Sequence, residues 1–435
     1  MLTGHQREIL DEALHILVTS NRLLIKGSAG VGKTFLADYL EQRLVTLYGV
    51  KPTYITAPTH KALSVLRGKI NIDGREHIEF ITAHSAMKTK RKIHYKTGAI
   101  SFEPDFDPKY PPLKGIARMM LDEASMLNTE LLDYIEKYAT DHNTMVIFLG
   151  DEKQINPVGE EVSPVFQRGY PEVELTEIVR QGQGNPIIDL SRNLVWISGK
   201  EETLVTTSDS QMGYTYSNDR GRIIKALAEV NGTDELKYLA WTNKEVDNIN
   251  FLTRKAIYTD PKKIELDETL IFNSPYADTY FTNQEVMVES LGVDTVKLKY
   301  LSKNTRAKKV EVSNITLKLY RINIDSGVRV NDALPYGIIV VHEDSQKDFD
   351  NLKEFMVTQC KQFLLQWRDY YAFLEQFADV KYNHAITVHK SQGSTYDKSI
   401  VNVRNINMNR NKEEKNRLLY TAVTRASDLL ILYNV

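Results

Sequence analysis

A glycine-rich segment near the N-terminus has the residue types and spacing of a phosphate-binding loop. Residues 27–34 read Gly-Ser-Ala-Gly-Val-Gly-Lys-Thr and fit the pattern G-x-x-x-x-G-K-[ST]. The apolar run Leu23–Ile25 precedes the segment, and apolar residues at helical spacing follow it from Phe35 to Val45. In such a context backbone amides turn toward phosphate groups at a helix N-terminus, where negative charge is favoured. The segment therefore predicts a nucleoside triphosphate site.

Each position of this loop is a candidate ligand of the nucleotide. The Lys33 ammonium is expected to contact the β- and γ-phosphates, and the Thr34 hydroxyl is expected to ligate Mg²⁺. The alternative, a chance glycine-rich turn, does not require the flanking strand and helix. The candidates in the loop are Gly27, Ser28, Ala29, Gly30, Val31, Gly32, Lys33 and Thr34.

Two adjacent carboxylates follow another apolar run. Asp122 and Glu123 come directly after Met119–Leu121. In a P-loop protein an aspartate at this position holds Mg²⁺, and the neighbouring glutamate can accept a proton from the attacking water. Without the phosphate loop the same pair would be interpreted as a helix N-cap. With the loop, the pair predicts hydrolysis of the nucleotide rather than binding alone.

The elements that position these groups alternate between apolar runs and helical stretches. This alternation predicts a parallel, doubly wound α/β sheet. Residues 88–112 interrupt it, and the polar-apolar alternation around Lys96–Ala99 predicts a β-hairpin there. The apolar runs are Leu23–Ile25, Tyr54–Thr56, Ile116–Leu121 and Met145–Leu149.

A second α/β region begins near residue 182 and resumes from Ala385 to the end of the chain. Between these parts, β-branched runs from about Ile264 to Val341 predict a small antiparallel β-barrel. Residues 344–377 carry apolar side chains at helical spacing, which predicts one long helix or a helical pair.

Composition excludes several classes of protein. The 435 residues carry 55 basic and 57 acidic side chains, a net charge of −2, so any grip on nucleic acid must be local. No apolar stretch approaches the roughly 18 residues of a membrane helix, and the N-terminus has no secretory pattern. The single cysteine, Cys360, excludes an internal disulfide and fits a reducing cytoplasm. No Cys/His cluster has the spacing of a zinc site.

In content and order, the motifs of this sequence resemble those of superfamily 1 helicases from residue 2 to residue 426. Motif III departs from the family at Asn156, where proline is usual, and this leaves the loop shape open. The matching segments are residues 2–6 (the adenine-reading Q motif), 57–62 (Ia), 122–125 (II), 150–154 (III), 175–181 (IV), 385–395 (V) and 419–426 (VI).

The resemblance implies two RecA-like P-loop domains that enclose ATP and Mg²⁺ between them. Arg180 and Arg425 would reach across from the second domain as arginine fingers, each worth on the order of 10³–10⁵ in rate. Gln154 would sense the γ-phosphate and orient water. Gln6 and Gly393 complete the implied nucleotide ligands. Taken alone, each arginine would be interpreted as a surface or salt-bridge residue.

The resemblance also implies a path for single-stranded DNA across both domains. Hydroxyls and amides suit phosphate contacts that do not read sequence, and ring faces can stack bases. Phe102 is the preferred hairpin residue for meeting the duplex, with packing on its own domain as the alternative. For His84 and His389 the alternative is a buried, hydrogen-bonded histidine. The candidates are Pro58, Thr59, His60, Thr82, His84, Phe102, Thr242, Asn243, Thr387, His389 and Lys390.

The places of the insertions resemble superfamily 1B, the phage Dda-type and RecD-type helicases, which move 5′→3′ on DNA. The first half has room only for a hairpin that acts as a separation pin, and the long insertion lies between Asn243 and Ala385. The expected divisions are residues 1–85 and 113–178 (domain 1A), 86–112 (pin, 1B), 179–250 and 381–435 (domain 2A), and 251–380 (2B, an SH3-like β-barrel plus helices).

These observations predict an ATP-dependent DNA helicase that translocates 5′→3′ and serves phage DNA replication or recombination. Expected partners are single-stranded DNA, its junction with duplex, and a single-strand-binding or other replication protein. We expect a monomer without membrane association in the cytoplasm, that of a bacterial host if the chain is phage-encoded. Two alternatives stay open: a nucleotide-gated remodelling module that does not translocate, and the same motor acting on RNA.

Overall fold

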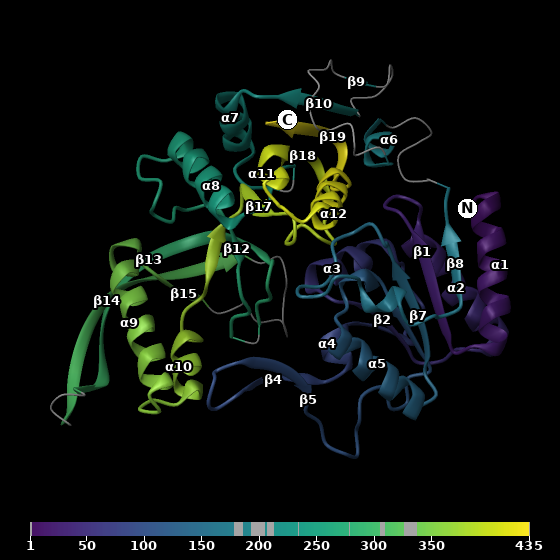
Figure 1. The fold of residues 1–435 in the computed structure, drawn as a ribbon, viewed down its shortest axis with the longest axis horizontal. Coiled ribbons are helices and arrows are strands. Elements are labelled where there is room, and N and C mark those ends of the chain that lie inside the picture. The colour runs from purple at the N-terminus through teal and green to yellow at the C-terminus, as the bar shows by residue number, and fades with distance from the viewer. Residues whose placement is uncertain are drawn as a thin grey trace.

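A six-stranded parallel sheet forms the core of the first 175 residues in the computed structural model (Figure 1). Its strand order is β3-β2-β6-β7-β1-β8. The two edge strands, β3 and β8, escaped sequence analysis because glutamates interrupt their apolar residues. The strands are β1 (Arg22–Gly27), β2 (Thr53–Ala57), β3 (Ile78–Thr82), β6 (Arg118–Leu121), β7 (Met145–Gly150) and β8 (Glu172–Leu175).

Helices cover both faces of this sheet. Leucine, isoleucine and alanine side chains of α1 and α2 pack on one face, and those of α4 and α5 pack on the other. The short 3₁₀ helix η1 (Ala124–Met126) follows β6 directly. The helices are α1 (Gly4–Thr19), α2 (Lys33–Tyr48), α3 (His60–Lys69), α4 (Ala83–Ala86) and α5 (Thr129–Asp141).

A second six-stranded sheet has the order β17-β11-β18-β19-β10-β9 and is parallel except at the β9–β10 pair. Helices α6, α11 and α12 pack on one face, and α7 and α8 pack on the other. The elements are α6 (Pro186–Arg192), β9 (Val205–Thr206), β10 (Gly213–Ser217), α7 (Arg220–Val230), β11 (Leu236–Ala240), α8 (Asn243–Ile257), β17 (Ala385–Thr387), β18 (Tyr396–Asn402), α11 (Val403–Asn407), α12 (Lys412–Val423) and β19 (Ala426–Tyr433).

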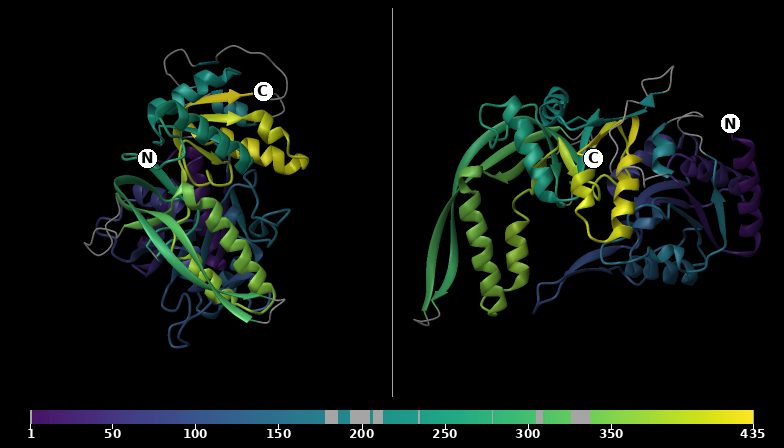
Figure 2. Two further views of the ribbon diagram at one scale, coloured as in Figure 1. Left: turned by 90° about the vertical axis from the view of Figure 1, so that its left-hand side faces the viewer. Right: turned by 45° about the horizontal axis from the view of Figure 1, so that its top comes forward.

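A five-stranded antiparallel sheet lies between β11 and β17 in the sequence. Its order is β15-β14-β13-β12-β16, and β13 and β14 continue outward as a long two-stranded arm (Figure 2). The order is open among the described residues, so the closed SH3-like barrel stays a prediction. The insertion carries two helices rather than one. The elements are β12 (Thr269–Phe272), β13 (Glu285–Asn304), β14 (Lys309–Asp325), β15 (Ile338–Val341), α9 (Glu343–Lys361), α10 (Trp367–Leu374) and β16 (Val380–Tyr382).

The hairpin predicted around Lys96–Ala99 is present as β4 (Thr89–Ile93) and β5 (Ile100–Pro104). It projects from the first domain toward α10 (Figure 1). The prediction of two parallel sheets with antiparallel insertions is thereby confirmed. The structure describes residues 2–177, 186–192, 205–206, 213–233, 235–277, 279–304, 309–325 and 337–434. Among these, no helix combines the length and apolar character needed to cross a membrane.

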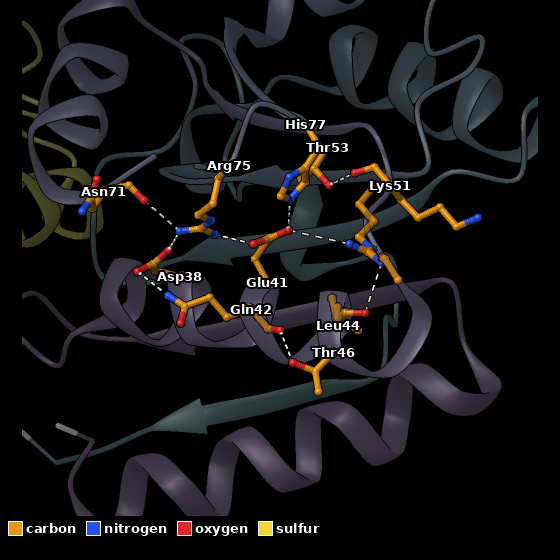
Figure 3. A network of polar contacts seen from close by, with 12 residues as sticks. Asp38, Glu41, Gln42, Leu44, Thr46, Lys51, Thr53, Asn71, Arg75 and His77 are labelled. Atoms are coloured by element: carbon orange, nitrogen blue, oxygen red, sulfur yellow. Dashed lines mark hydrogen bonds and ion pairs between the residues drawn. The ribbon is translucent and has the colours of Figure 1, made fainter. Parts of the chain in front are cut away.

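A cluster of charged side chains around Glu41 connects α2 to the segment before β3 (Figure 3). The fully buried Glu41 carboxylate of α2 accepts from Arg75, lies 2.9 Å from the His77 ring nitrogen Nε2 and lies 3.6 Å from the Arg118 guanidinium. Asp38, one helical turn earlier, also pairs with Arg75. Paired in this way, the charges tie the segment before β3 to α2, which begins at the phosphate loop. Breaking a buried pair of this kind costs about 3–5 kcal/mol.

Candidate active site

A cavity of about 510 Å³ lies where the two parallel sheets face each other. Its first wall comes from α1, the phosphate loop, α3 and the end of β6. Its opposite wall comes from the region between β17 and β19, which is more than two hundred residues away in sequence. The polar and charged lining residues are Gln6, Ser28, Lys33, Thr34, Lys69, Asp122, Glu123, Gln154, Thr395, Thr424 and Arg425.

The phosphate loop has the backbone that its glycines allow. Gly30 and Gly32 lie in the left-handed region, at φ values of 85° and 84°. Helix α2 begins at Lys33, whose ammonium donates to the Gly27 and Ser28 carbonyl oxygens at 2.6 and 3.2 Å. Ser28, Ala29, Gly30, Gly32 and Lys33 all line the cavity beside the start of α2, which is where phosphate groups bind in such loops.

Oxygen ligands converge beside the loop. The Thr34 hydroxyl donates to the Asp122 carboxylate at 2.7 Å, and the Glu123 amide donates to the same carboxylate at 2.8 Å. A hydroxyl and a carboxylate are the kind of oxygen donors that Mg²⁺ takes beside phosphates, so the residues fit the ion. Burial raises the pKa of Glu123, and the Asp122 charge raises it further. A carboxylate held in this way can accept a proton.

Gln6 is buried between α1 and the phosphate loop. Its side-chain oxygen accepts from the Thr3 amide at 3.1 Å, and its side-chain nitrogen donates to the Val31 carbonyl oxygen at 3.2 Å. A Cβ added at Gly32 would lie 2.7 Å from that nitrogen. Gln6 therefore supports the loop directly, and its contact with adenine stays a prediction.

Arg425 lines the opposite wall of the cavity. Its guanidinium is buried and donates to the carbonyl oxygens of Thr421 and Ser394, each at 3.0 Å, which fixes its position at the end of α12. The Arg425 charge acts across the cavity on Glu123. It lowers the pKa of that carboxyl group, although burial raises the same pKa by more. A cation therefore faces the phosphate loop from the second domain.

Helix α12 also carries a residue that sequence analysis missed. The Tyr420 hydroxyl donates to the Asp151 carboxylate at 2.7 Å and accepts from the Ala29 amide at 3.0 Å. Burial raises the pKa of this hydroxyl, so it stays protonated. Tyr420 lies inside the predicted motif VI segment, but only the fold brings its hydroxyl to the phosphate loop. Arg417 on the same helix donates to the Gln154 carbonyl oxygen at 3.0 Å.

The remaining predicted nucleotide ligands differ in their placement. Gln154 is buried and lines the cavity, and its side-chain oxygen has no partner among the described residues. Gly27, Val31 and Gly393 are not among the residues that line the cavity. Gly393 instead lies against α3, where an added Cβ would approach the Ala62 Cβ to 2.9 Å. Arg180 lies outside the described residues.

Motif III holds its shape without the usual proline. The Asn156 side chain donates to the Glu161 carbonyl oxygen at 2.5 Å and so closes the loop itself. The neighbouring Ile155 carbonyl oxygen accepts from the Gln392 side chain at 3.2 Å, another bond between the two domains. The departure at Asn156 thus leaves a loop that still contacts the second domain.

Comparisons with known proteins agree with this arrangement. Residues 1–211 match the family described as an AAA domain, and residues 382–433 match the UvrD-like helicase C-terminal domain. The chain is 27% identical to the ATP-dependent DNA helicase dda of Enterobacteria phage T4, over 93% of this chain and 92% of that protein. It is 28% identical to the uncharacterized protein R530 of Acanthamoeba polyphaga mimivirus, over 93% of both chains.

Among solved structures, a Pif1 helicase from a study of unwinding at forked double-stranded DNA matches with a TM-score of 0.50 and 17% identity, covering 99% of this chain and 92% of that one. In sequence and fold the chain is similar to the superfamily 1B helicases of the Pif1, RecD and Dda type. It is an ATP-dependent helicase.

The candidate strand contacts of the helicase gather where strands end and helices begin. Thr59 and Thr242 follow β2 and β11, and Thr82 is the last residue of β3. The hydroxyls of these three residues cap α3, α8 and α4, respectively. Pro58 and Asn243 adjoin these caps. Helix N-termini favour anions, so the arrangement suits phosphate groups of a strand. His60 and Thr82 line a second cavity of about 530 Å³ on this side.

Burial shifts the pKa values of the other candidate histidines and of the candidate lysine. Burial lowers the pKa of His84 and of His389, and also that of Lys390. His84 contacts the Thr89 hydroxyl at 3.0 Å and the half-exposed Phe102 ring at 5.4 Å between ring centres. Lys390 donates to the Asn273 side chain. Thr387 is largely buried and accepts from the Lys390 amide at 3.4 Å.

The hairpin tip is docked on α10 of the helicase. The Trp367 indole donates to the Lys96 carbonyl oxygen at 3.3 Å, and the Tyr371 hydroxyl donates to the Gly98 carbonyl oxygen at 2.8 Å. Gly98 has a φ of 69° and lies so close to the Trp367 ring that a Cβ would collide with it. Trp367 and Tyr371 of α10 are therefore packing surface for the hairpin.

Proposed function

We propose that this helicase acts on DNA, translocates 5′→3′ on the single strand and separates duplex at a junction. One observation carries the proposal. The nucleotide cavity takes Lys33 from one domain and Arg425 from the other, so nucleotide binding and hydrolysis change how the two domains are held together. The candidate strand contacts lie on both of these domains. Relative movement of the domains would therefore become movement along a strand.

Within this proposal each side chain of the cavity has a task. Lys33 and the loop amides hold the phosphates, Gln154 orients the attacking water, and Glu123 accepts its proton. Arg425, together with Arg180, offsets the charge that develops on the transferred phosphoryl group. Thr34 and Asp122 would hold Mg²⁺, which when bound neutralises phosphate charge. Gln6 reads adenine, and Gly393 allows motif V to approach α3.

DNA as the substrate is supported by the names of the relatives. The phage T4 relative is a DNA helicase, and the Pif1 structure comes from work on forked double-stranded DNA. The hairpin of β4 and β5 would be the pin at the junction, with Phe102 toward the duplex, and the docked α10 would brace it. The domain divisions, the SH3-like closure of the inserted sheet, a replication or recombination role in a phage, and a monomeric state belong to the same proposal.

The direction of travel is tested with two partial duplexes that differ only in the polarity of the single-stranded tail. With ATP and Mg²⁺, the substrate with a 5′ tail should be unwound, whereas the one with a 3′ tail should stay intact. The reverse result would reject the polarity. Unwinding of neither, with hydrolysis that ignores DNA, would favour a nucleotide-gated module.

The substrate class is tested in parallel, with an inactive variant of the motor as the control. Matched DNA and RNA oligomers are compared for stimulation of ATP hydrolysis, and DNA should stimulate more strongly. Lys33→Ala should abolish hydrolysis with either oligomer, because the side chain that holds the phosphates is gone. Stronger stimulation by RNA would overturn the choice of DNA.

A further inference from the structure

The 530 Å³ cavity has a wall that no helicase motif of the sequence supplies. One side consists of α3 and the end of β3, where the predicted contacts His60 and Thr82 lie. The other side is residues 279–285, the loop that leads into β13 of the inserted antiparallel sheet. The cavity is therefore closed by a segment more than two hundred residues away from the motif that it faces.

Two rings meet across this cavity. The His60 and Phe281 rings are stacked, with centres 3.4 Å apart and planes 11° from parallel. Both side chains are only partly buried, so the pair is reachable from solvent. Burial lowers the pKa of His60 to about 4, with the Arg67 charge as a smaller cause, so the ring is neutral at pH 7. A neutral, planar imidazole ring stacks on a phenyl ring in the same way that a nucleobase does.

The loop holds the Phe281 ring in place from both ends. The Phe281 amide donates to the Gln284 side chain at 3.0 Å, and the Gln284 amide donates back to the Phe281 carbonyl oxygen at 3.0 Å. The Asn283 amide donates to the Phe272 carbonyl oxygen at 2.8 Å, and its side chain reaches the Lys390 carbonyl oxygen at 3.5 Å. The ring is thus presented by a turn that contacts the second domain as well as α3.

The polar and charged part of the lining suits the phosphates of a nucleotide. Hydroxyls surround the ring pair, cationic side chains of α3 lie beside them, and Phe80 adds a further ring. Hydroxyls and cations suit phosphate oxygens, whereas rings suit base faces. The volume is within the range of small-ligand sites. The hydroxyls include those of Ser64, Thr82 and Thr279, and the cations are Lys61 and Arg67. Lys61 lies 3.7 Å from the Glu285 carboxylate, which also lines the cavity.

We propose that Phe281 stacks on a nucleobase of the bound strand and that the His60–Phe281 stack is the strand-free arrangement of this site. A base enters between the two rings, which then cover its two faces. This inference rests on the proposed function and extends it, because it adds a base contact from the loop before β13, a segment outside the helicase motifs. Any base fits, because every base has a flat face.

The experiment measures the binding of a fluorescein-labelled oligothymidylate and of the same oligomer with one abasic site moved along it. Loss of one stacked base should weaken binding by the wild-type helicase at one position, by about 5- to 150-fold. Phe281→Ala should weaken binding of the intact oligomer by a similar factor. The abasic site should then cause no further loss. Phe281→Tyr should restore both the affinity and the abasic penalty.

Phe251→Ala is the matched control, because Phe251 is a partly exposed phenylalanine of α8 that lines neither cavity. It should leave binding within about twofold of the wild type. The proposal is overturned if no abasic position weakens binding by the wild-type protein, a measurement that needs no variant. It is also overturned if Phe281→Ala retains the penalty. Failure of the wild type to bind the oligomer at all would instead reject the proposed function.

Discussion

The nucleotide cavity and the strand-side cavity are nearly equal in volume, about 510 and 530 Å³, but their walls are joined in different ways. Across the nucleotide cavity the second domain is joined to the first by hydrogen bonds, from Tyr420 to Asp151 and from the Ala29 amide to Tyr420. Across the strand-side cavity the contacts include a ring stack and a Lys61–Glu285 ion pair of 3.7 Å.

The difference follows from what each cavity must do. Hydrogen bonds depend steeply on distance and angle, so they fix reacting groups to a fraction of an ångström. Stacked rings tolerate sliding and exchange of partner, because the attraction is spread over whole faces. One cavity therefore has the means to position atoms, and the other has the means to let a strand pass. The predictions below test this contrast, beginning with the nucleotide side.

Removal of the cation on the far wall should have the largest effect. Arg425→Ala should lower the maximal rate of DNA-stimulated ATP hydrolysis by about 10³-fold, because the developing phosphoryl charge loses its partner across the cavity. Steady-state hydrolysis measures the rate. Arg404→Ala, which removes an exposed arginine from α11, is the control and should leave the rate unchanged. A loss below tenfold for Arg425→Ala would mean that the second domain does not complete the site.

Removal of one hydroxyl from the same interface should have a smaller effect. Tyr420→Phe leaves the Ala29 amide and the Asp151 carboxylate without their shared partner, which costs about 1–3 kcal/mol for a buried group. We expect about a tenfold lower maximal rate, with a smaller change in the KM for ATP. Tyr433→Phe, in buried β19, is the control. Equal losses in both variants would assign the effect to stability instead of positioning.

On the nucleotide side, sequence alone could name candidate residues because the chemistry requires fixed residue types at short spacing. This spacing is what identifies residues 27–34 and the pair Asp122 and Glu123 as candidates. Tyr420 did not, because a tyrosine in an amphipathic helix is usually core. Its hydroxyl becomes informative only when α12 is placed against the phosphate loop.

On the strand side, the sequence could name residues on only one wall of the cavity. His60 and Thr82 could be named from motifs, but Phe281 lies in a loop with no pattern of its own, and only the fold places it on His60. The inserted sheet shows the same limit. Its β-branched runs predicted antiparallel strands, whereas the outward arm of β13 and β14 depends on a long register that residue types do not specify. The two edge strands β3 and β8 did not stand out because Glu79 and Glu174 interrupt their apolar residues.

A variant of α10, the helix on which the hairpin tip is docked, tests whether the hairpin is a rigid part of the strand side. Trp367→Ala removes the ring on which Gly98 rests, so the pin should yield when it meets the duplex. We expect the unwinding rate to fall by about fivefold while hydrolysis stimulated by single strands stays within about twofold, since a large aromatic contact is lost far from the nucleotide. Gel-based unwinding and hydrolysis assays measure the two rates. Arg368→Ala, an exposed neighbour on α10, should change neither, and a parallel fall in both rates would show that α10 supports the whole molecule rather than the pin.

The smallest effect expected is that of pH on strand affinity. Protonation of His60 would add a cation beside the strand and tighten binding as the pH falls, but burial lowers the pKa of His60 to about 4, so the ring is only about 1% protonated at pH 6. Burial lowers the pKa of His84 and His389 as well. Affinity for an oligothymidylate, measured by anisotropy at constant ionic strength, should therefore change by less than about twofold between pH 8 and pH 6. Binding that tightens steadily over this range, and stops doing so in His60→Gln, would mean that His60 acts through charge. The contrast between a cavity that positions atoms by hydrogen bonds and a cavity that holds bases by ring stacking would then no longer hold.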